Sequence, residues 1–284
     1  MTGKEKRQKF WKQVRIELTE NKNTFLVFSG MRIVVILMMI LQFFNQNYEN
    51  MFLCLLTLML MMMPSILQVT LKIELPSTLE IILLCFIFAA EILGEISSFY
   101  IHFPYWDTIL HTLNGFLCAA IGFSLAEILN RHERLQFDLS PLFLAIVAFS
   151  FSMTIGVLWE FFEFAMDTFF KLDMQKDTVI HTIISTYLDP TKENLRVVIP
   201  GIEEVVINGE PLGVGGYLDI GLIDTMMDMI VNFIGAVIFA VMGYFYMKHQ
   251  SRKNVILSLV PTPQDEHKYE KLEAQEERAE GKSE

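Results

Sequence analysis

The chain has 284 residues, of which 52% are hydrophobic and 19% are charged, and its formal net charge is −11. Soluble domains average about 45–50% apolar and about 25% charged residues, so this excess of apolar residues in long runs is typical of a membrane protein. No basic stripe follows the short one at the N-terminus, which disfavours nucleic acid as a partner. The three cysteines lie in apolar runs and predict no disulfide framework.

Six apolar runs reach the length of about 20 residues that a transmembrane helix needs. They cover residues 25–44, 51–71, 79–98, 106–129, 141–165 and 222–247. The sequence therefore predicts an all-α integral membrane protein, a bundle of six transmembrane helices. The expected segments are a basic tail (1–22), helices one to five (23–166), a long loop (167–221), helix six (222–247) and an acidic tail (248–284). The polar N-terminus argues against a cleavable signal peptide.

Lys and Arg residues alternate between the connections, and this alternation predicts the orientation. The connections 45–50 and 99–105 contain no Lys or Arg. The N-terminal tail, Lys72, the pair Arg131 and Arg134, and the flank with Lys248, Arg252 and Lys253 are basic. Basic connections stay in the cytoplasm, so we expect a multi-pass plasma-membrane protein with both termini cytoplasmic.

The long loop is expected to face outward and to carry its own structure. Asp177 and Thr178 are a plausible cap for an amphipathic helix whose apolar residues recur at helical spacing. These residues are Ile180, Ile183, Ile184, Tyr187 and Leu188. Asn208-Gly209 after an apolar, β-branched run predicts a small β-hairpin. The acidic tail has few apolar residues and is expected to be disordered or loosely helical.

Eight carboxylates lie inside or at the ends of the predicted helices, toward the outer face. They are Glu91, Glu95, Asp107, Glu160, Glu163, Asp167, Asp224 and Asp228. His111 and Asn114 continue the face of Asp107, and Asn232 continues that of Asp228. Because charge inside a membrane is costly, such residues predict a functional site. We expect the polar faces of four helices to meet in one outward-open cavity that binds a cation or a substrate.

Some of these acids are also explained by a purely structural role. Asp107, Asp167 and Asp224 lie at helix ends, where charge costs little, and Asp107 is also a natural helix cap. The residues that lie deeper in the predicted membrane helices favour a functional site. Glu91 lies nearest the middle of the membrane, at about 18 Å from the inner edge, which suits a proton or cation relay.

The residue types point to hard metal ions or to protons. Carboxylates with one imidazole suit Mg²⁺, Ca²⁺ or Mn²⁺ better than zinc. A candidate metal set is Asp107, His111, Glu163 and Asp228, with Glu160 as a candidate general base. Crowded carboxylates also raise one another's pKa, which suits proton carriage. The chain lacks the serine-hydrolase, zinc-protease and nucleotide-binding motifs.

Three motifs in combination resemble a known family. They are Trp106 to His111 with Asn114-Gly115, Gly156 to Glu163, and Asp224 to Asp228 with Asn232 and Gly235. The combination resembles the YjdF-like bacterial membrane proteins and, more distantly, the VanZ-like membrane proteins. The resemblance implies a bacterial plasma-membrane location and importance for the acids and the histidine in these motifs, and it implies no reaction.

Three functions are compatible with these patterns. The first is binding, with or without transport, of a cation or of an envelope-derived lipid or small molecule. The second is a metal-dependent hydrolase or transferase that acts on a lipid-linked or exported substrate. The third is an envelope scaffold or accessory protein that recruits a partner through the long loop. The sequence leaves the substrate and the oligomeric state open.

Overall fold

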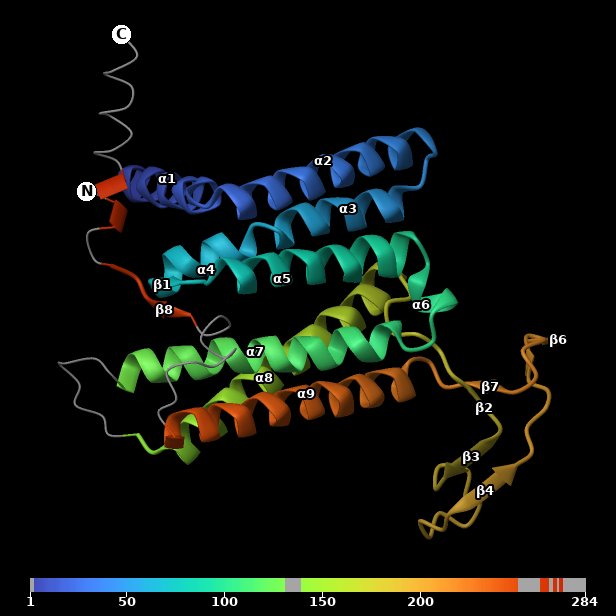
Figure 1. Cartoon of the computed structure of the whole chain (residues 1–284). Helices are drawn as coiled ribbons and strands as arrows, with labels where there is room; N and C mark the ends of the chain where they lie inside the picture. Colours follow the sequence, from blue (N-terminus) through green and yellow to red (C-terminus); the bar gives the residue numbers. More distant parts are fainter. Residues whose placement is uncertain (1–2, 131–138, 250–260, 266–267, 270, 273–284) are drawn as a thin grey trace. The chain divides into compact units, whose positions relative to one another are not determined.

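The computed structural model describes residues 3–130, 139–249, 261–265, 268–269 and 271–272. This part of the chain is mostly helical, and five of its helices are long and apolar enough to cross a membrane (Figure 1). These candidate spans are Lys22–Phe44, Tyr48–Leu71, Trp106–Asn130, Pro141–Phe170 and Leu222–Lys248. Arg131, Arg134, Arg252 and Lys253, on which the predicted orientation also depends, lie outside the described residues.

The chain divides into two compact units. The first comprises Met1–Met153 and Asn232–Glu284, and the second comprises Thr154–Val231. The helices α8 (Pro141–Ala165) and α9 (Leu222–His249) each contribute residues to both units.

Short polar signals separate the first helices of the first unit. Asn21 lies between α1 (Gly3–Glu20) and α2 (Lys22–Phe44). Its side chain caps α2 by accepting the backbone N–H groups of Asn23 and Thr24. Asn47 caps α3 (Tyr48–Leu60) in the same way. The run predicted at 51–71 continues as α4 (Met63–Leu71), because Pro64 lacks an N–H group and suits the first turn of a new helix.

The run predicted at 79–98 is divided in the structure. An α-helix, α5 (Ser77–Phe88), passes into the π-helical segment η1 (Ala89–Ile96) and then into the short helix α6 (Phe99–His102). The indole N–H of Trp106 donates to the carbonyl of Ala89 at 3.3 Å, where the π-helical segment begins. This segment is not among the five candidate spans, so the six-helix count is not confirmed.

The core of the first unit around α7 (Trp106–Asn130) depends on small residues that let the helices approach closely. Phe123 of α7 and Phe239 of α9 are fully buried, with ring centroids 6.0 Å apart, among Ala119, Ala120 and Ala236. A Cβ atom on Gly235 would overlap the backbone carbonyl of Thr112, and one on Gly115 would overlap that of Asn232. Small residues at such crossings are typical of helix pairs in membranes.

The C-terminal part of the chain is docked onto the N-terminal part where it is described. The strand β8 (Thr262–Pro263) pairs antiparallel with β1 (Ile73–Glu74), and the backbone N–H of Gln264 donates to the carbonyl of Lys72 at 3.0 Å (Figure 1). Residues 268–269 and 271–272 of the acidic tail are helical, and the remaining tail residues at 250–260, 266–267, 270 and 273–284, for which disorder or loose helix was expected, lie outside the described residues.

The second unit contains small strands where an amphipathic helix was expected. After the π-helical segment η2 (Met166–Phe170), Val179–Ile180 forms β2 and Thr182–Ser185 forms β3. The predicted helix is therefore wrong. Its residues are mostly β-branched, which favours extended backbone. In β3 the adjacent Ile183 and Ile184 lie on opposite faces, one partly buried and one exposed.

The strands of the second unit pair in three small antiparallel ladders. β3 pairs with β4 (Val197–Pro200), and β2 pairs with β7 (Tyr217–Leu218). β5 (Val206–Ile207) pairs with β6 (Glu210–Pro211) across Asn208 and Gly209, which both have positive φ.

Asp189 orders the connection between β3 and β4. Hydrogen bonds to Asp189 from the Thr191 side chain and from the backbone N–H groups of Leu195, Thr191 and Glu193 lower the pKa of this carboxyl.

The crossing of α7 and α9 gives a first testable expectation. Gly235→Ala should destabilise the protein by about 1–3 kcal/mol, because the added methyl group overlaps the Thr112 carbonyl and forces the helices apart. Gly30→Ala is the matched control, since a Cβ atom there meets nothing within 4 Å. Thermal unfolding in detergent measures both. Equal stability of Gly235→Ala and the wild type would show that the close approach is not required.

Candidate functional site

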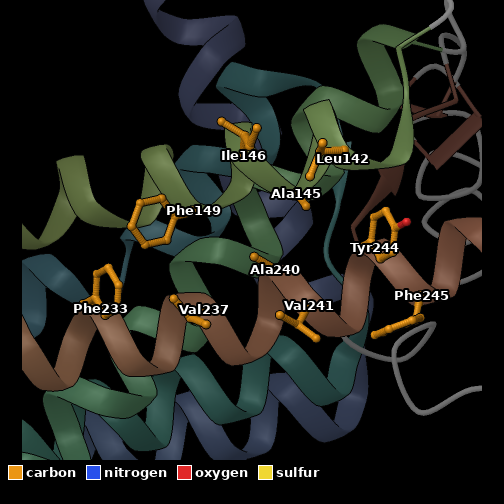
Figure 2. A pocket seen from close by; sticks show the side chains of 10 residues that line it. All are labelled: Leu142, Ala145, Ile146, Phe149, Phe233, Val237, Ala240, Val241, Tyr244 and Phe245. Atoms are coloured by element: carbon orange, nitrogen blue, oxygen red, sulfur yellow. The ribbon is translucent and has the colours of Figure 1, made fainter.

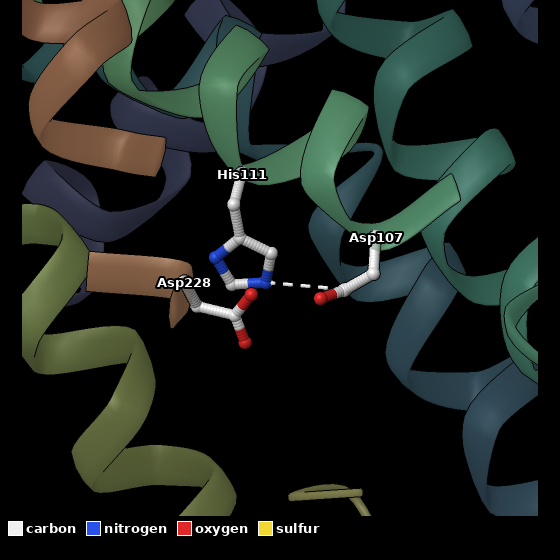
Figure 3. A group of neighbouring side chains, drawn as sticks. All are labelled: Asp107, His111 and Asp228. Carbon is white, nitrogen blue, oxygen red and sulfur yellow. Dashed lines mark ion pairs between the residues drawn. The ribbon is translucent and has the colours of Figure 1, made fainter. Parts of the chain in front are cut away.

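The first unit contains the predicted pair of Asp107 and His111. Both side chains belong to the first turns of α7, and Nε2 of His111 lies 3.5 Å from Oδ1 of Asp107 (Figure 3). The side chain of His111 is 12% exposed and that of Asp107 is 31% exposed. A carboxylate beside an imidazole orients the ring and determines which ring nitrogen faces it. The pair is therefore suited to proton exchange or to metal binding.

Asn114 and Asn232 form a polar link between α7 and α9. The amide of Asn114 donates to the side-chain oxygen of Asn232 at 3.0 Å, and the amide of Asn232 contacts the sulfur of Met153 at 3.6 Å. Asn232 is only 2% exposed. On the adjoining helix, the hydroxyl of Ser152 donates to the carbonyl of Gly115 at 2.7 Å. The two asparagines, predicted to bind a substrate or cation, thus bind each other and stabilise the helix crossing.

The second unit brings three of the predicted acids together. Glu160 and Glu163 lie on consecutive turns of α8, and Asp228 lies on α9. The three residues are buried, and each offers one carboxylate oxygen such that the three oxygens lie within 4.8 Å of one another. We call Glu160, Glu163 and Asp228 the acidic triad. Such a distance is compatible with a single metal ion bound by all three.

Trp159 orients one member of the acidic triad. Its indole N–H donates to Oε1 of Glu163 at 2.8 Å, from four residues earlier on the same helix. Trp159 was not among the predicted site residues. The spacing of four residues between an N–H donor and a carboxylate is the signal for this contact.

Two of the predicted acids instead hold the backbone of the loop. The two carboxylate oxygens of Asp167 accept the N–H groups of Met174 at 2.7 Å and Gln175 at 2.9 Å. Asp224 accepts the N–H of Lys176 at 2.7 Å. The structural reading of these two helix-end acids therefore has direct support.

Asp219, which was missed from the sequence, has a similar structural role. Its two oxygens accept the N–H groups of Thr178 and Ile223, each at 2.7 Å. An Asp shortly before a helix start is the available signal, because its side chain can cap the first N–H groups of the helix.

Glu91 and Glu95 lie in the π-helical segment η1 of the first unit. Glu91 is 3% exposed, and within the described residues its Oε2 atom has no hydrogen-bond partner. Neither residue belongs to the acidic triad. The predicted metal set of Asp107, His111, Glu163 and Asp228 draws its members from both units and stays a prediction.

A polar cluster between the two ends of the chain was also missed. The ammonium group of Lys268 lies 3.1 Å from Glu17, 2.7 Å from Glu20 and 3.6 Å from Glu74. Gln264 and Tyr269 donate to the same oxygen of Glu17, at 2.8 and 2.9 Å. No local pattern could reveal this cluster, because Glu17 and Lys268 are 251 residues apart.

Burial and charge shift the pKa values of Glu17 and Lys268 in opposite directions. Burial raises the pKa of Glu17 above its ordinary value, although the Lys268 charge opposes this shift. Burial opposes protonation of Lys268, but the hydrogen bond to Glu20 and the charge of Glu17 outweigh it and raise the pKa of the ammonium group. The cluster therefore keeps its cation at neutral pH.

Long apolar helices that carry buried acidic and amide side chains define a helical integral membrane protein. The model of a family described as predicted membrane protein (DUF2238) matches residues 27–249, and the chain belongs to this family. An uncharacterized protein of Thermotoga maritima is 29% identical over 94 residues, which cover 33% of this chain and 46% of that protein. The chain thus matches less than half the length of this relative.

No solved structure matches the chain. The resemblance to YjdF-like proteins is not confirmed by these matches, and the more distant resemblance to VanZ-like proteins is not supported. The family description specifies membrane location and leaves the activity open.

The loop contacts of Asp167 predict a local effect of its charge. Asp167→Asn replaces one acceptor oxygen by an NH₂ group that cannot accept the N–H of Met174 or Gln175. A hydrogen bond to a charged group contributes about 1.5–3 kcal/mol, so amide exchange at these two positions should rise by about ten- to a hundredfold. Hydrogen–deuterium exchange measures this. The exposed Asp173→Asn is the control, and unchanged exchange in Asp167→Asn would exclude the capping role.

Proposed function

We propose that the acidic triad of Glu160, Glu163 and Asp228 binds a divalent cation, and that this site serves the binding, with possible transport, of a cation or an envelope-derived substrate. The observation that carries the proposal is the approach of three buried carboxylate oxygens to within 4.8 Å of one another. The triad lies at segments that are long and apolar enough to cross a membrane.

Electrostatics explains why a cation suits this arrangement of carboxylates. Two unit charges about 4 Å apart repel by about 4 kcal/mol at the effective dielectric constant of a protein interior. Burial adds a further cost for each ionised carboxylate. A divalent ion bound by all three oxygens would offset this repulsion. Oxygen ligands suit Mg²⁺, Ca²⁺ or Mn²⁺, and zinc is less suitable.

Trp159 gives the site a defined orientation and a spectroscopic reporter. Its hydrogen bond to Glu163 holds that carboxylate in one direction, as outer-shell hydrogen bonds commonly do around metal ions. Because the indole ring lies next to a proposed ligand, its excitation should sensitise the emission of a bound lanthanide.

We also propose that α5 and η1 together form a sixth span and that both termini lie on the cytoplasmic side of the plasma membrane. The two elements follow one another over about 20 residues, the length that a span needs. A second observation supports an even number of membrane spans. Lys268 pairs with Glu17 and Glu20, so the two ends of the chain meet on one side of the membrane. An odd number of spans would place them on opposite sides.

The metal content of the purified protein tests the proposed site. Wild type should bind about one divalent ion per chain, measured by elemental mass spectrometry, and Asp228→Asn and Glu163→Gln should lose it. Glu204→Gln, an exposed acid of the second unit, is the control and should retain the ion. With Tb³⁺ as the probe, Trp excitation should produce sensitised emission in the wild type. Trp159→Phe should abolish most of that emission and weaken binding by less than about tenfold.

The outcomes separate the alternatives. No metal in the wild type after supplementation would overturn cation binding and favour protons shared among the three carboxylates. Full metal retention in Asp228→Asn would place the metal elsewhere. Loss of a stoichiometric metal in Asp228→Asn would support the proposal and justify a screen for the metal-dependent hydrolase or transferase alternative, with chelation as its control.

The span number is tested by tags at the two ends of the chain. Six spans predict that both tags are protected in cells with an intact plasma membrane and become accessible to a protease after permeabilisation. Accessibility of one tag in intact cells would indicate five spans and would also contradict the contact between Glu17 and Lys268.

A further inference from the structure

An apolar groove runs between α8 and α9 within the first unit. It has a volume of about 630 Å³, within the range of about 300–1,000 Å³ that is usual for ligand sites (Figure 2). Leu142, Ile146 and Phe149 of α8 and Phe233, Val237 and Val241 of α9 line it. Tyr244 is the lining residue that carries a polar side-chain atom, so the groove suits a hydrocarbon occupant.

The length of the groove matches one leaflet of a bilayer. From Phe233 to Phe245 the groove follows α9 for about 18 Å, at about 1.5 Å per residue. The hydrocarbon core of a bilayer is about 30 Å thick, so one leaflet contributes about 15 Å. The groove is therefore long enough for one acyl chain.

One end of the groove carries a cation and a hydroxyl group. Lys248 lies one turn beyond Tyr244 on α9, and its ammonium group is 5.7 Å from the centroid of the Tyr244 ring. The side chain of Lys248 is exposed. Tyr and Lys at a helix end are typical of the membrane–water interface, where lipid phosphate groups lie. The polar end thus complements an anionic headgroup while the rest of the groove complements its acyl chain.

We infer that this groove binds one phospholipid with an anionic headgroup, its acyl chain along Val237 and Val241 and its phosphate at Lys248 and Tyr244. The occupant is a bound lipid with a headgroup preference, in contrast to the exchanging lipid that surrounds every membrane protein. This inference requires only the membrane location of the family and is independent of the acidic triad.

A variant that fills the groove tests the acyl-chain site. Palmitoyl-oleoyl phosphatidylglycerol is added to delipidated protein in detergent, and retained lipid is counted by native mass spectrometry. Val241→Trp should reduce retention at least tenfold, because the indole occupies the groove. Ile238→Trp is the matched control, since Ile238 is on the same helix and similarly exposed (46% against 49% for Val241) but does not line the groove. Equal retention by Val241→Trp and wild type would overturn the site and indicate adventitious lipid.

The headgroup preference is tested at exposed residues that folding does not require. Phosphatidylglycerol should be retained in preference to phosphatidylcholine with the same chains, and Lys248→Gln should reduce this preference by about fivefold. Lys22→Gln, an exposed lysine at the start of another span, should leave it unchanged. Equal retention of the two lipids by wild type would overturn the anionic preference. A lipid-free dimer that Val241→Trp dissociates would identify a second copy as the occupant and overturn the inference.

Discussion

The central constraint on this chain is that charge buried away from water needs a partner, and the chain itself supplies the partners. Asp107 meets His111, Glu17 meets Lys268, and Asp167 meets two backbone N–H groups. The contact of Glu17 with Lys268 joins segments far apart in the sequence, and the contacts of Asp167 hold the backbone of the loop. In the acidic triad three carboxylates come together, and the short distances between their oxygens are the basis of the proposed cation site.

Close backbone packing and polar pairing support one another in the first unit. Gly115 and Gly235 allow α7 and α9 to approach so closely that the side chains of Asn114 and Asn232 reach each other. The amide pair then provides a directional contact at a crossing that apolar side chains alone would leave free to slide. In an apolar solvent, packing and hydrogen bonds supply the attraction that the hydrophobic effect supplies in water.

Much of the helical structure could be predicted from the sequence, because long apolar runs have few alternatives in a membrane. The α-helices α2, α7, α8 and α9 lie within a few residues of their predicted positions. Periodicity was less reliable in the loop, where β-branched residues at helical spacing form strands instead. The π-helical form of η1 was also not predicted, and neither was the hydrogen bond at its start from Trp106, which lies 17 residues from Ala89. Asp167 and Asp224 resemble the triad residues in sequence, and only their contacts with the loop backbone distinguish their role.

The cluster around Glu17 has a consequence for the synthesis of the chain. Ribosomes complete α1 long before they reach Lys268, which is 251 residues further along the chain. Throughout that interval Glu17 has no access to this cation, and β1 has no access to its partner strand β8. The first helix therefore reaches its final environment only after the last span has been inserted. Closure of this cluster is therefore a late step in the folding of the chain.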